Sequence, residues 1–186
     1  MTRSIFFILI CLASAFKAFS VEVGFVTYQD HLDGSSVMYH VFISYPDKNS
    51  QWIHAYPPNG VESFHQFDRA FFPPSERYTL KIEIFSAPAW VLPTESYQVY
   101  FGKKFDRFYH GDNQHTTYCS KMVGELLGIP TTPFEDDPTR RGISVKNVYD
   151  FLHKNSLFQK TRVLYRLSPQ TPFQELPHIS CQSLLL

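Results

Sequence analysis

The sequence lacks an excess of either charge sign and has no extended basic segment. Lys and Arg together number 17, as do Asp and Glu, so the formal net charge is +0. The longest basic runs are the pairs Lys103-Lys104 and Arg140-Arg141. Because nucleic-acid binding depends on clustered positive charge, this distribution argues against DNA or RNA as a partner.

Long hydrophobic runs are missing as well, apart from one at the N-terminus. Ile5–Ala13 is apolar but too short to span a bilayer. Arg3 precedes it, and Ala18-Phe19-Ser20 follows with small residues where a signal peptidase reads them. We therefore expect residues 1–20 to be a signal peptide and residues 21–186 to be one exported domain, periplasmic or secreted, without a transmembrane span. An uncleaved anchor is the alternative.

Cysteine is scarce, so a disulfide framework does not explain the fold. The three cysteines are Cys11, Cys119 and Cys181, and Cys11 falls within the expected leader. A chain of this length buries a sufficient core without such cross-links. In an exported protein Cys119 and Cys181 could pair. The state of Cys181, in a tail without a pattern, stays open.

Aromatic residues are plentiful, with 18 Phe and 11 Tyr, and 13 Pro interrupt the chain. Aromatic and β-branched residues favour strands. Strands are expected at residues 21–27, 37–45, 51–56, 78–85 and 163–167. Helical patterns follow at residues 93–101, 116–127 and 144–153, the last with Ser144 as its N-cap. This order predicts an α+β domain with a mostly antiparallel sheet packed against helices.

Cys119 lies near the start of the expected helix 116–127, whose apolar stripe includes Met122, Val123 and Leu126. The first turn of a helix leaves backbone N–H groups unpaired and carries the positive end of the helix dipole. Both features favour a thiolate, which is the nucleophilic form of cysteine. The same N–H groups could stabilise an oxyanion at an attacked carbonyl.

A cysteine nucleophile requires a base, and histidine titrates near neutral pH. Of eight histidines, His40 and His54 lie in the middle of the apolar strands VMYHVFISY and QWIHAY. If these strands form a hairpin, the two side chains lie beside each other on one sheet face. A purely structural role for both histidines is the competing interpretation.

Other chemistries find less support. The histidines at His31, His40, His54 and His65 are spaced by 9, 14 and 11 residues, which matches no compact zinc motif. A Gly-x-Ser-x-Gly elbow and a phosphate-binding Gly-rich loop are both missing from the sequence. We therefore expect neither a metal nor a cofactor.

Several segments together resemble a known family. Tyr118-Cys119-Ser120-Lys121-Met122-Val123 resembles the signature of the permuted papain-like, NlpC-type cysteine hydrolases of the YiiX group. Gly102-Lys103-Lys104-Phe105-Asp106 resembles the segment that precedes this cysteine. His40-Val41, Trp52-Ile53-His54-Ala55 and Pro58-Asn59-Gly60-Val61 resemble the histidine strand and its hairpin partner. The histidine precedes the cysteine, as in the permuted members and the related lecithin:retinol acyltransferases.

The resemblance implies a permuted papain-like fold and a covalent mechanism. Cys119 would be the nucleophile, His40 its base and His54 the residue that orients His40. The implied reaction is hydrolysis of an amide bond, with peptides or peptidoglycan fragments as substrates. Two alternatives stay open: a lipid-directed thiol acyltransferase or esterase, as in the retinol acyltransferase relatives, and an inactive binding module on the same fold.

Three positions depart from the pattern of the YiiX group. His54 stands where that group usually has glutamate, whereas the retinol acyltransferase relatives have a second histidine. Phe42 replaces a small glycine and is expected to narrow the site. Tyr39 replaces a small hydroxyl residue, and the sequence alone does not define its effect on substrate access.

Overall fold

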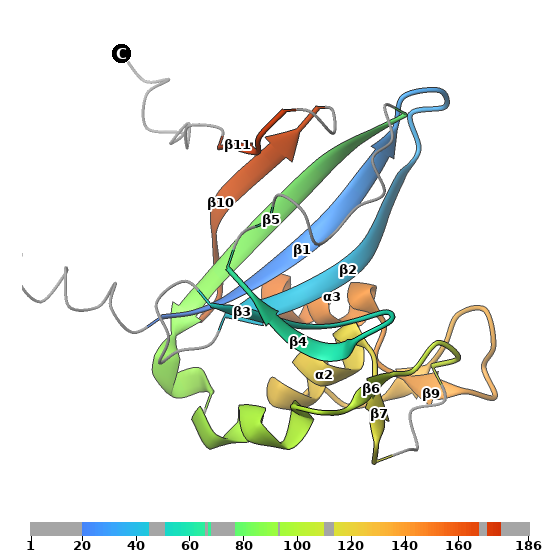
Figure 1. Ribbon diagram of the computed structural model, residues 1–186, viewed down its shortest axis with the longest axis vertical. Helices are drawn as coiled ribbons and strands as arrows, with labels where there is room; N and C mark the ends of the chain where they lie inside the picture. The colour runs from blue at the N-terminus through green and yellow to red at the C-terminus, as the bar shows by residue number, and fades with distance from the viewer. Residues whose placement is uncertain are drawn as a thin grey trace, which may run out of the picture.

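The protein was analysed as a computed structural model (Figure 1). It describes residues 20–44, 51–65, 67, 77–92, 94–109, 114–167 and 171–175. Nearly all of the expected signal peptide, together with Cys11 and Cys181, lies outside these residues, so the leader and the state of Cys181 stay predictions. Within the described residues, no helix combines the length and apolar character needed to cross a membrane.

A seven-stranded antiparallel sheet forms the body of the molecule, with the strand order β11-β10-β5-β1-β2-β3-β4. Its strands are β1 (Ser20–Asp30), β2 (Ser36–Ser44), β3 (Trp52–Tyr56), β4 (Gly60–Phe64), β5 (Tyr78–Pro88), β10 (Gln159–Arg166) and β11 (Gln174–Glu175). In Figure 1 the long strands β5, β1 and β2 run side by side, and the β3–β4 hairpin turns across the lower end of β2.

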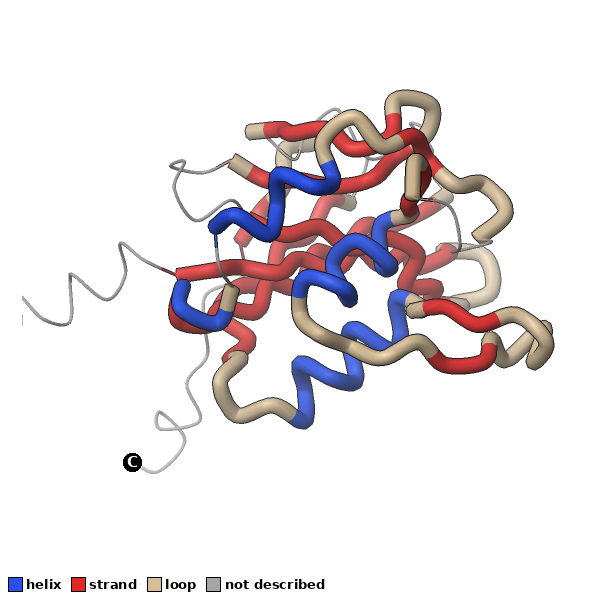
Figure 2. The backbone as a smooth tube through the Cα atoms, turned by 90° about the horizontal axis from the view of Figure 1, so that it is seen from below, coloured by secondary structure: helices blue, strands red, loops and turns tan. Residues whose placement is uncertain are grey.

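The helices gather at the same end of the sheet as this hairpin. They are α2 (Cys119–Leu126), α3 (Val145–Lys154) and the 3-10 helices η1 (Ala89–Val91) and η2 (Thr94–Tyr100). Short two-residue pairs accompany them: β6 (Lys104–Phe105) with β7 (Thr116–Thr117), and β8 (Thr132–Pro133) with β9 (Arg141–Gly142). Helix α2 packs against β2, β3 and α3, and Figure 2 shows the helices in front of the strands.

Most elements agree with the predictions from the sequence. All five expected strands are present, and Ser144 caps α3 through a capping box with Asn147. The helix expected at residues 116–127 begins later than predicted, because Thr116–Thr117 pair with β6 as the short strand β7. Cys119 is therefore the first helical residue, and the extended Tyr118 precedes it as the N-cap. The helical segment expected at residues 93–101 is a 3-10 helix.

Two buried clusters lie on opposite faces of the sheet, because successive side chains of a strand point to opposite sides. We call the cluster under the helices the helix-side core; it includes Val41, Ala55 and Cys119. The cluster on the other face is the second core, and it includes Phe42 and Trp52. The sheet separates the two cores.

Candidate active site

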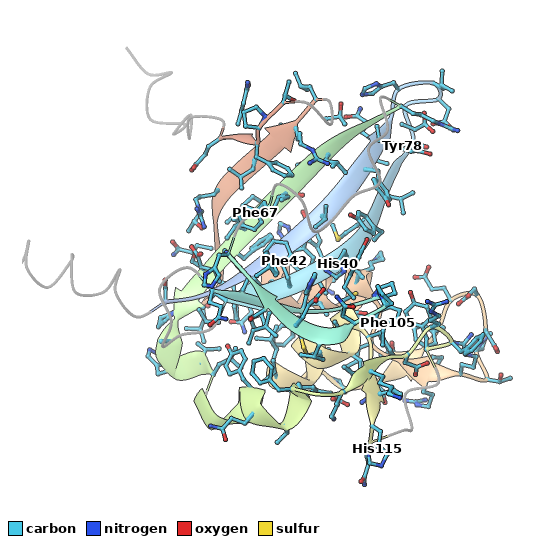
Figure 3. The ribbon with its side chains drawn as sticks, viewed as in Figure 1. His40, Phe42, Phe67, Tyr78, Phe105 and His115 are labelled. Atoms are coloured by element: carbon cyan, nitrogen blue, oxygen red, sulfur yellow. The ribbon has the colours of Figure 1, made fainter. Side chains whose placement is uncertain are left out.

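The β2 and β3 strands bring His40 and His54 together, as the sequence predicts. These strands pair at Ile43–Ile53 and Ser44–Trp52, at the end of β2 that follows His40. Although the two histidines are 14 residues apart in the chain, His40 Nε2 lies 3.1 Å from His54 Nδ1. Both residues are buried, with exposed fractions of 3% and 0%. Figure 3 shows His40 next to Phe42.

Glu62 extends this pair, and it is a residue that the sequence did not point to. In the β3–β4 hairpin Glu62 is the direct partner of His54. Its Oε1 lies 3.3 Å from His54 Nε2, and its Oε2 accepts a hydrogen bond from Asn59 Nδ2 at 2.8 Å. Only the register across the turn after Tyr56 places Glu62 there. An acidic residue eight positions after a strand histidine is not by itself a signal.

The donors and acceptors of this chain assign its tautomers. A carboxylate only accepts hydrogen bonds, so His54 Nε2 carries the proton donated to Glu62. His54 Nδ1 is then the acceptor, and His40 Nε2–H is the donor between the rings. A neutral imidazole has one N–H, so Nδ1 of His40 is the basic nitrogen. The chain from Glu62 to His40 thus determines which atom of His40 can take up a proton.

Cys119 lies beside the histidine strand at the start of α2. It is a free thiol with an exposed fraction of 5%. Its sulfur receives hydrogen bonds from the backbone N–H groups of Val41, Ser120 and Cys119 itself. Val41 directly follows His40 in β2. The sulfur therefore lies against the strand that carries His40, surrounded by backbone donors from two elements.

Burial changes the expected ionisation of all three site residues. It raises the pKa of the Cys119 thiol above its ordinary value, despite the N–H donors that favour the thiolate. The expectation that the helix start makes Cys119 a resting thiolate is therefore wrong, because the cost of burying a charge exceeds the stabilisation by these donors. Burial, and to a lesser degree His54, holds the pKa of His40 well below its usual value. Burial also lowers the pKa of His54 to about 4, although Glu62 opposes this shift.

The histidine rings face the second core, whereas Cys119 belongs to the helix-side core. His40 and His54 alternate along their strands with Val41 and Ala55, which pack in the same cluster as Cys119. The ring centroid of His54 lies 4.8 Å from that of Phe64, next to the second core. The sulfur and the imidazoles thus lie on different sides of β2.

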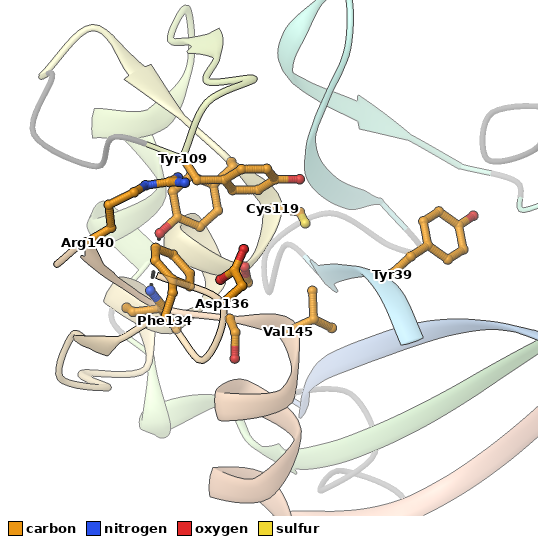
Figure 4. A pocket seen from close by; sticks show the side chains of 11 residues that line it. Tyr39, Tyr109, Cys119, Phe134, Asp136, Arg140 and Val145 are labelled. Carbon is orange, nitrogen blue, oxygen red and sulfur yellow. Dashed lines mark hydrogen bonds between the residues drawn. The ribbon is translucent and has the colours of Figure 1, made fainter. Parts of the chain in front are cut away.

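Cys119 also lines a cavity of about 210 Å³, which Figure 4 shows from close by. The cavity lies between the beginnings of α2 and α3 and the β8–β9 loop. Its other lining residues are Tyr39, Tyr109, Tyr118, Ser120, Phe134, Asp136, Arg140, Ile143, Ser144 and Val145. A small substrate group could reach the sulfur from this side.

The two aromatic departures from the family pattern have different roles. Tyr39 lines the cavity and stacks on Tyr28, with ring centroids 4.0 Å apart. Phe42 is not among the lining residues and lies in the second core. It occupies space above Gly24, where an added Cβ would lie 2.1 Å from Phe42 Cζ. Gly24 across the strand pair thus accommodates the ring, whose centroid lies 6.5 Å from that of His40.

Tyr118 connects the start of α2 to the opposite wall of the cavity. Its hydroxyl accepts a hydrogen bond from the backbone N–H of Ile143 at 3.2 Å. Gly142 allows this close approach, since a Cβ there would lie 2.4 Å from the Tyr118 hydroxyl and 2.3 Å from Phe134 Cζ. The position of Cys119 therefore depends on contacts with the β9–α3 segment as well as with β2.

Comparisons with protein-family models, curated proteins and solved structures gave no match. The structure itself shows a mixed α/β domain with a large antiparallel sheet and, within the described residues, two α-helices. Among the same residues, no three His, Cys, Asp or Glu side chains are grouped as they would be around a metal ion.

Proposed function

We propose that this protein is an exported cysteine hydrolase with a permuted papain-like fold that cleaves an amide bond. Cys119 is the nucleophile, His40 its base and His54 the residue that orients His40. The observation that carries the proposal is an arrangement at β2. The free thiol of Cys119 accepts a hydrogen bond from the Val41 N–H group. The residue before Val41 is His40, which is hydrogen-bonded to His54, and His54 in turn is hydrogen-bonded to Glu62.

In the proposed reaction His40 Nδ1 removes the Cys119 proton as the sulfur attacks the substrate carbonyl carbon. A C–S bond forms and the carbonyl π electrons move onto the oxygen. When the tetrahedral intermediate collapses, the C–N bond breaks and the protonated His40 gives its proton to the leaving nitrogen. Water, deprotonated by His40, then attacks the acyl carbon. The C–S bond breaks, which yields a carboxylic acid and restores the thiol.

The oxygen that becomes negative requires donors fixed in advance, because reorienting groups during the reaction costs energy. The N–H groups of Cys119 and Ser120, at the open end of α2, are suited to this role. They contact the sulfur in the resting protein. As the sulfur forms the new C–S bond, the same donors become available to the oxyanion.

The ionisation of the resting site agrees with this sequence of steps. Burial raises the pKa of Cys119 and lowers that of His40, so both groups are neutral before substrate binds. Proton transfer then accompanies attack, instead of preceding it as a stable thiolate–imidazolium pair. Because the resting thiol is uncharged, it does not repel an anionic substrate.

Peptides are the substrates we favour, and peptidoglycan stem peptides would suit an exported bacterial enzyme. A lipid-directed thiol acyltransferase or esterase is the second candidate. The observation in its favour is the hydrogen bond between His40 and His54, since a second histidine at this place marks the retinol acyltransferase relatives. Hydrolysis of peptide stem fragments, compared with release of acyl chains from lipid micelles, separates the two.

The first test is the alkylation of Cys119 by iodoacetamide as a function of pH, followed at the Cys119 peptide by mass spectrometry. We expect the natural protein to react at neutral pH, because His40 removes the proton. His40→Ala should react about 100-fold more slowly at pH 7 and recover only in alkaline solution, as expected for the loss of a general base.

His31→Ala is the matched control, because His31 is exposed at the surface, where its Nε2 forms a hydrogen bond with Thr79. It should alkylate like the natural protein. Equal pH profiles for the natural protein and His40→Ala would contradict the proposed base. A Cys119 that alkylates no faster than a free cysteine would instead favour a binding module on this fold.

A further inference from the structure

The Cys119 cavity has a cationic side chain on its wall. Arg140 lies in the β8–β9 loop, and its Nη2 donates a hydrogen bond to the Phe108 carbonyl. Its guanidinium carbon lies 5.4 Å from the centroid of the Phe134 ring. Arg140 Nε is buried and, within the described residues, has no hydrogen-bond partner. The Arg140 side chain as a whole is partly exposed, but its Nε donor has lost water without gaining a partner, which is uncommon in folded proteins.

No acidic residue of the described chain neutralises Arg140 at salt-bridge distance. Asp136 also lines the cavity, but it is exposed to solvent. Asp137 interacts mainly with Thr139, which is the largest cause of the lowered pKa of its carboxyl group; the charge of Arg140 contributes less. Arg140 therefore places a cationic guanidinium group on one wall of the cavity.

Figure 4 shows that Arg140 and Cys119 are at opposite ends of the Tyr109 side chain. The guanidinium group lies near the backbone end of Tyr109, and the sulfur lies toward its hydroxyl end. A ligand along this wall could therefore place one group at the sulfur and another, separated by several bonds, at Arg140.

We infer that Arg140 binds an anionic group of the substrate, a carboxylate or a phosphate, while the scissile carbonyl lies at Cys119. This inference rests on the proposed function of Cys119 and adds a substrate class to it. A guanidinium group suits anionic oxygens because its N–H donors form a rigid planar fork. A bound anion would give Arg140 Nε a hydrogen-bond partner. The distance between the anionic group and the carbonyl within the substrate would then position the carbonyl at Cys119.

A structural role for Arg140 predicts a different outcome. Through the Phe108 carbonyl, Arg140 also supports the segment before Tyr109, whose φ of 54° lies in the left-handed region. If support of this wall were its whole role, replacing Arg140 would change access to Cys119 equally for neutral and anionic molecules. A comparison of matched neutral and anionic reagents therefore distinguishes the two roles.

The test uses alkyl methanethiosulfonates of graded chain length that end in a carboxylate or in a neutral carboxamide. In each reaction the Cys119 sulfur forms a disulfide with the alkylthio group, and methanesulfinate leaves. The rates are measured on the full chain at the Cys119 peptide, and the anionic-to-neutral ratio is compared with that of free cysteine. We expect a ratio above that of free cysteine at the chain length that spans the cavity.

Arg140→Gln should lower this ratio about tenfold, the effect expected from losing a charge-assisted hydrogen bond. Arg140→Lys should retain part of it. Arg141→Gln is the matched control, because Arg141 donates to the Thr131 carbonyl and does not line the cavity; its ratio should equal that of the natural protein. Protection of Cys119 by glutarate or by glycerol phosphate shows which anion the site prefers.

An unchanged ratio in Arg140→Gln would overturn the inference, as would equal losses for both reagents. The proposed function would survive either result if the neutral reagents still react at Cys119 with the help of His40. A Cys119 that reacts with neither reagent contradicts the proposed function, and the inference falls with it.

Discussion

Glu62 determines which ring nitrogen carries the proton in each of the two histidines. Its carboxylate accepts from His54 Nε2, which leaves His54 Nδ1 to accept from His40. In Glu62→Gln the amide can donate as well as accept, so it no longer selects one tautomer. We expect the alkylation rate of Cys119 at pH 7 to fall about tenfold, because only part of the molecules then carry the basic nitrogen of His40 toward Cys119.

The pH profile of alkylation separates this effect from general damage to the fold. Glu62 raises the pKa of His54 against the effect of burial, so its loss should also move the acidic limb of the profile. Asn59→Ala is the control, since it removes only the outer hydrogen bond to Glu62. A Glu62→Gln protein with the natural rate and profile would show that the carboxylate does not position the histidines.

At the scale of elements, α3 supports the cavity that Cys119 lines. Ser144 accepts a hydrogen bond from the Asn147 N–H, and the Asn147 side chain accepts from the Ser144 N–H. Ser144→Ala should lower the free energy of unfolding by about 1 kcal/mol, as expected for the loss of an N-cap. Urea unfolding followed by circular dichroism measures this change.

Lys146→Ala in the same helix is the control for Ser144→Ala. Lys146 pairs with Asp150 one turn later, and both side chains are substantially exposed. Such pairs contribute little to stability because water screens them, so this variant should unfold almost like the natural protein. Equal destabilisation by both substitutions would contradict the role of the capping box.

At the scale of the whole molecule, buried titratable groups make stability depend on pH. The folded pKa values of His40 and His54 lie below the usual histidine value of 6.5. Protonation therefore favours the unfolded chain, and stability that is complete above pH 6.5 is lost as the pH falls toward about 4. For His54 the loss is on the order of 3 kcal/mol.

A second group acts at lower pH. Glu83 is buried between Lys81 and Lys160. Burial alone would raise its pKa, but the two lysines together lower it below the usual value of 4.5. The stability that Glu83 contributes is fully present above pH 4.5 and is lost as the pH falls through the lowered pKa of the folded protein. Stability should therefore decrease in two successive windows on acidification.

Denaturant unfolding between pH 8 and about 3 tests this dependence. His54→Gln should reduce the upper window, of which the part due to His40 remains, and should leave the lower window in place. His31→Ala should retain both, because His31 is bound at the surface to Thr79. An upper window of natural size in His54→Gln would contradict the role assigned to this buried imidazole.

The sequence by itself determined the local elements and much of the candidate site. Alternating apolar residues predicted the strands that carry His40 and His54, and the Ser144 cap predicted the start of α3. The hairpin interpretation also placed the two histidines together. Such patterns are readable because they depend on neighbours in the chain: strand alternation, turn residues and caps.

Only the tertiary structure decided what these residues face. The register of β3 with β4 brought Glu62 to His54, and the β8–β9 loop brought Arg140 to the cavity of Cys119. Burial reversed the expected pKa shift of Cys119, because desolvation outweighs the donors of the helix start. These outcomes depend on contacts between distant segments and on the exclusion of water, and neither quantity is contained in a local sequence pattern.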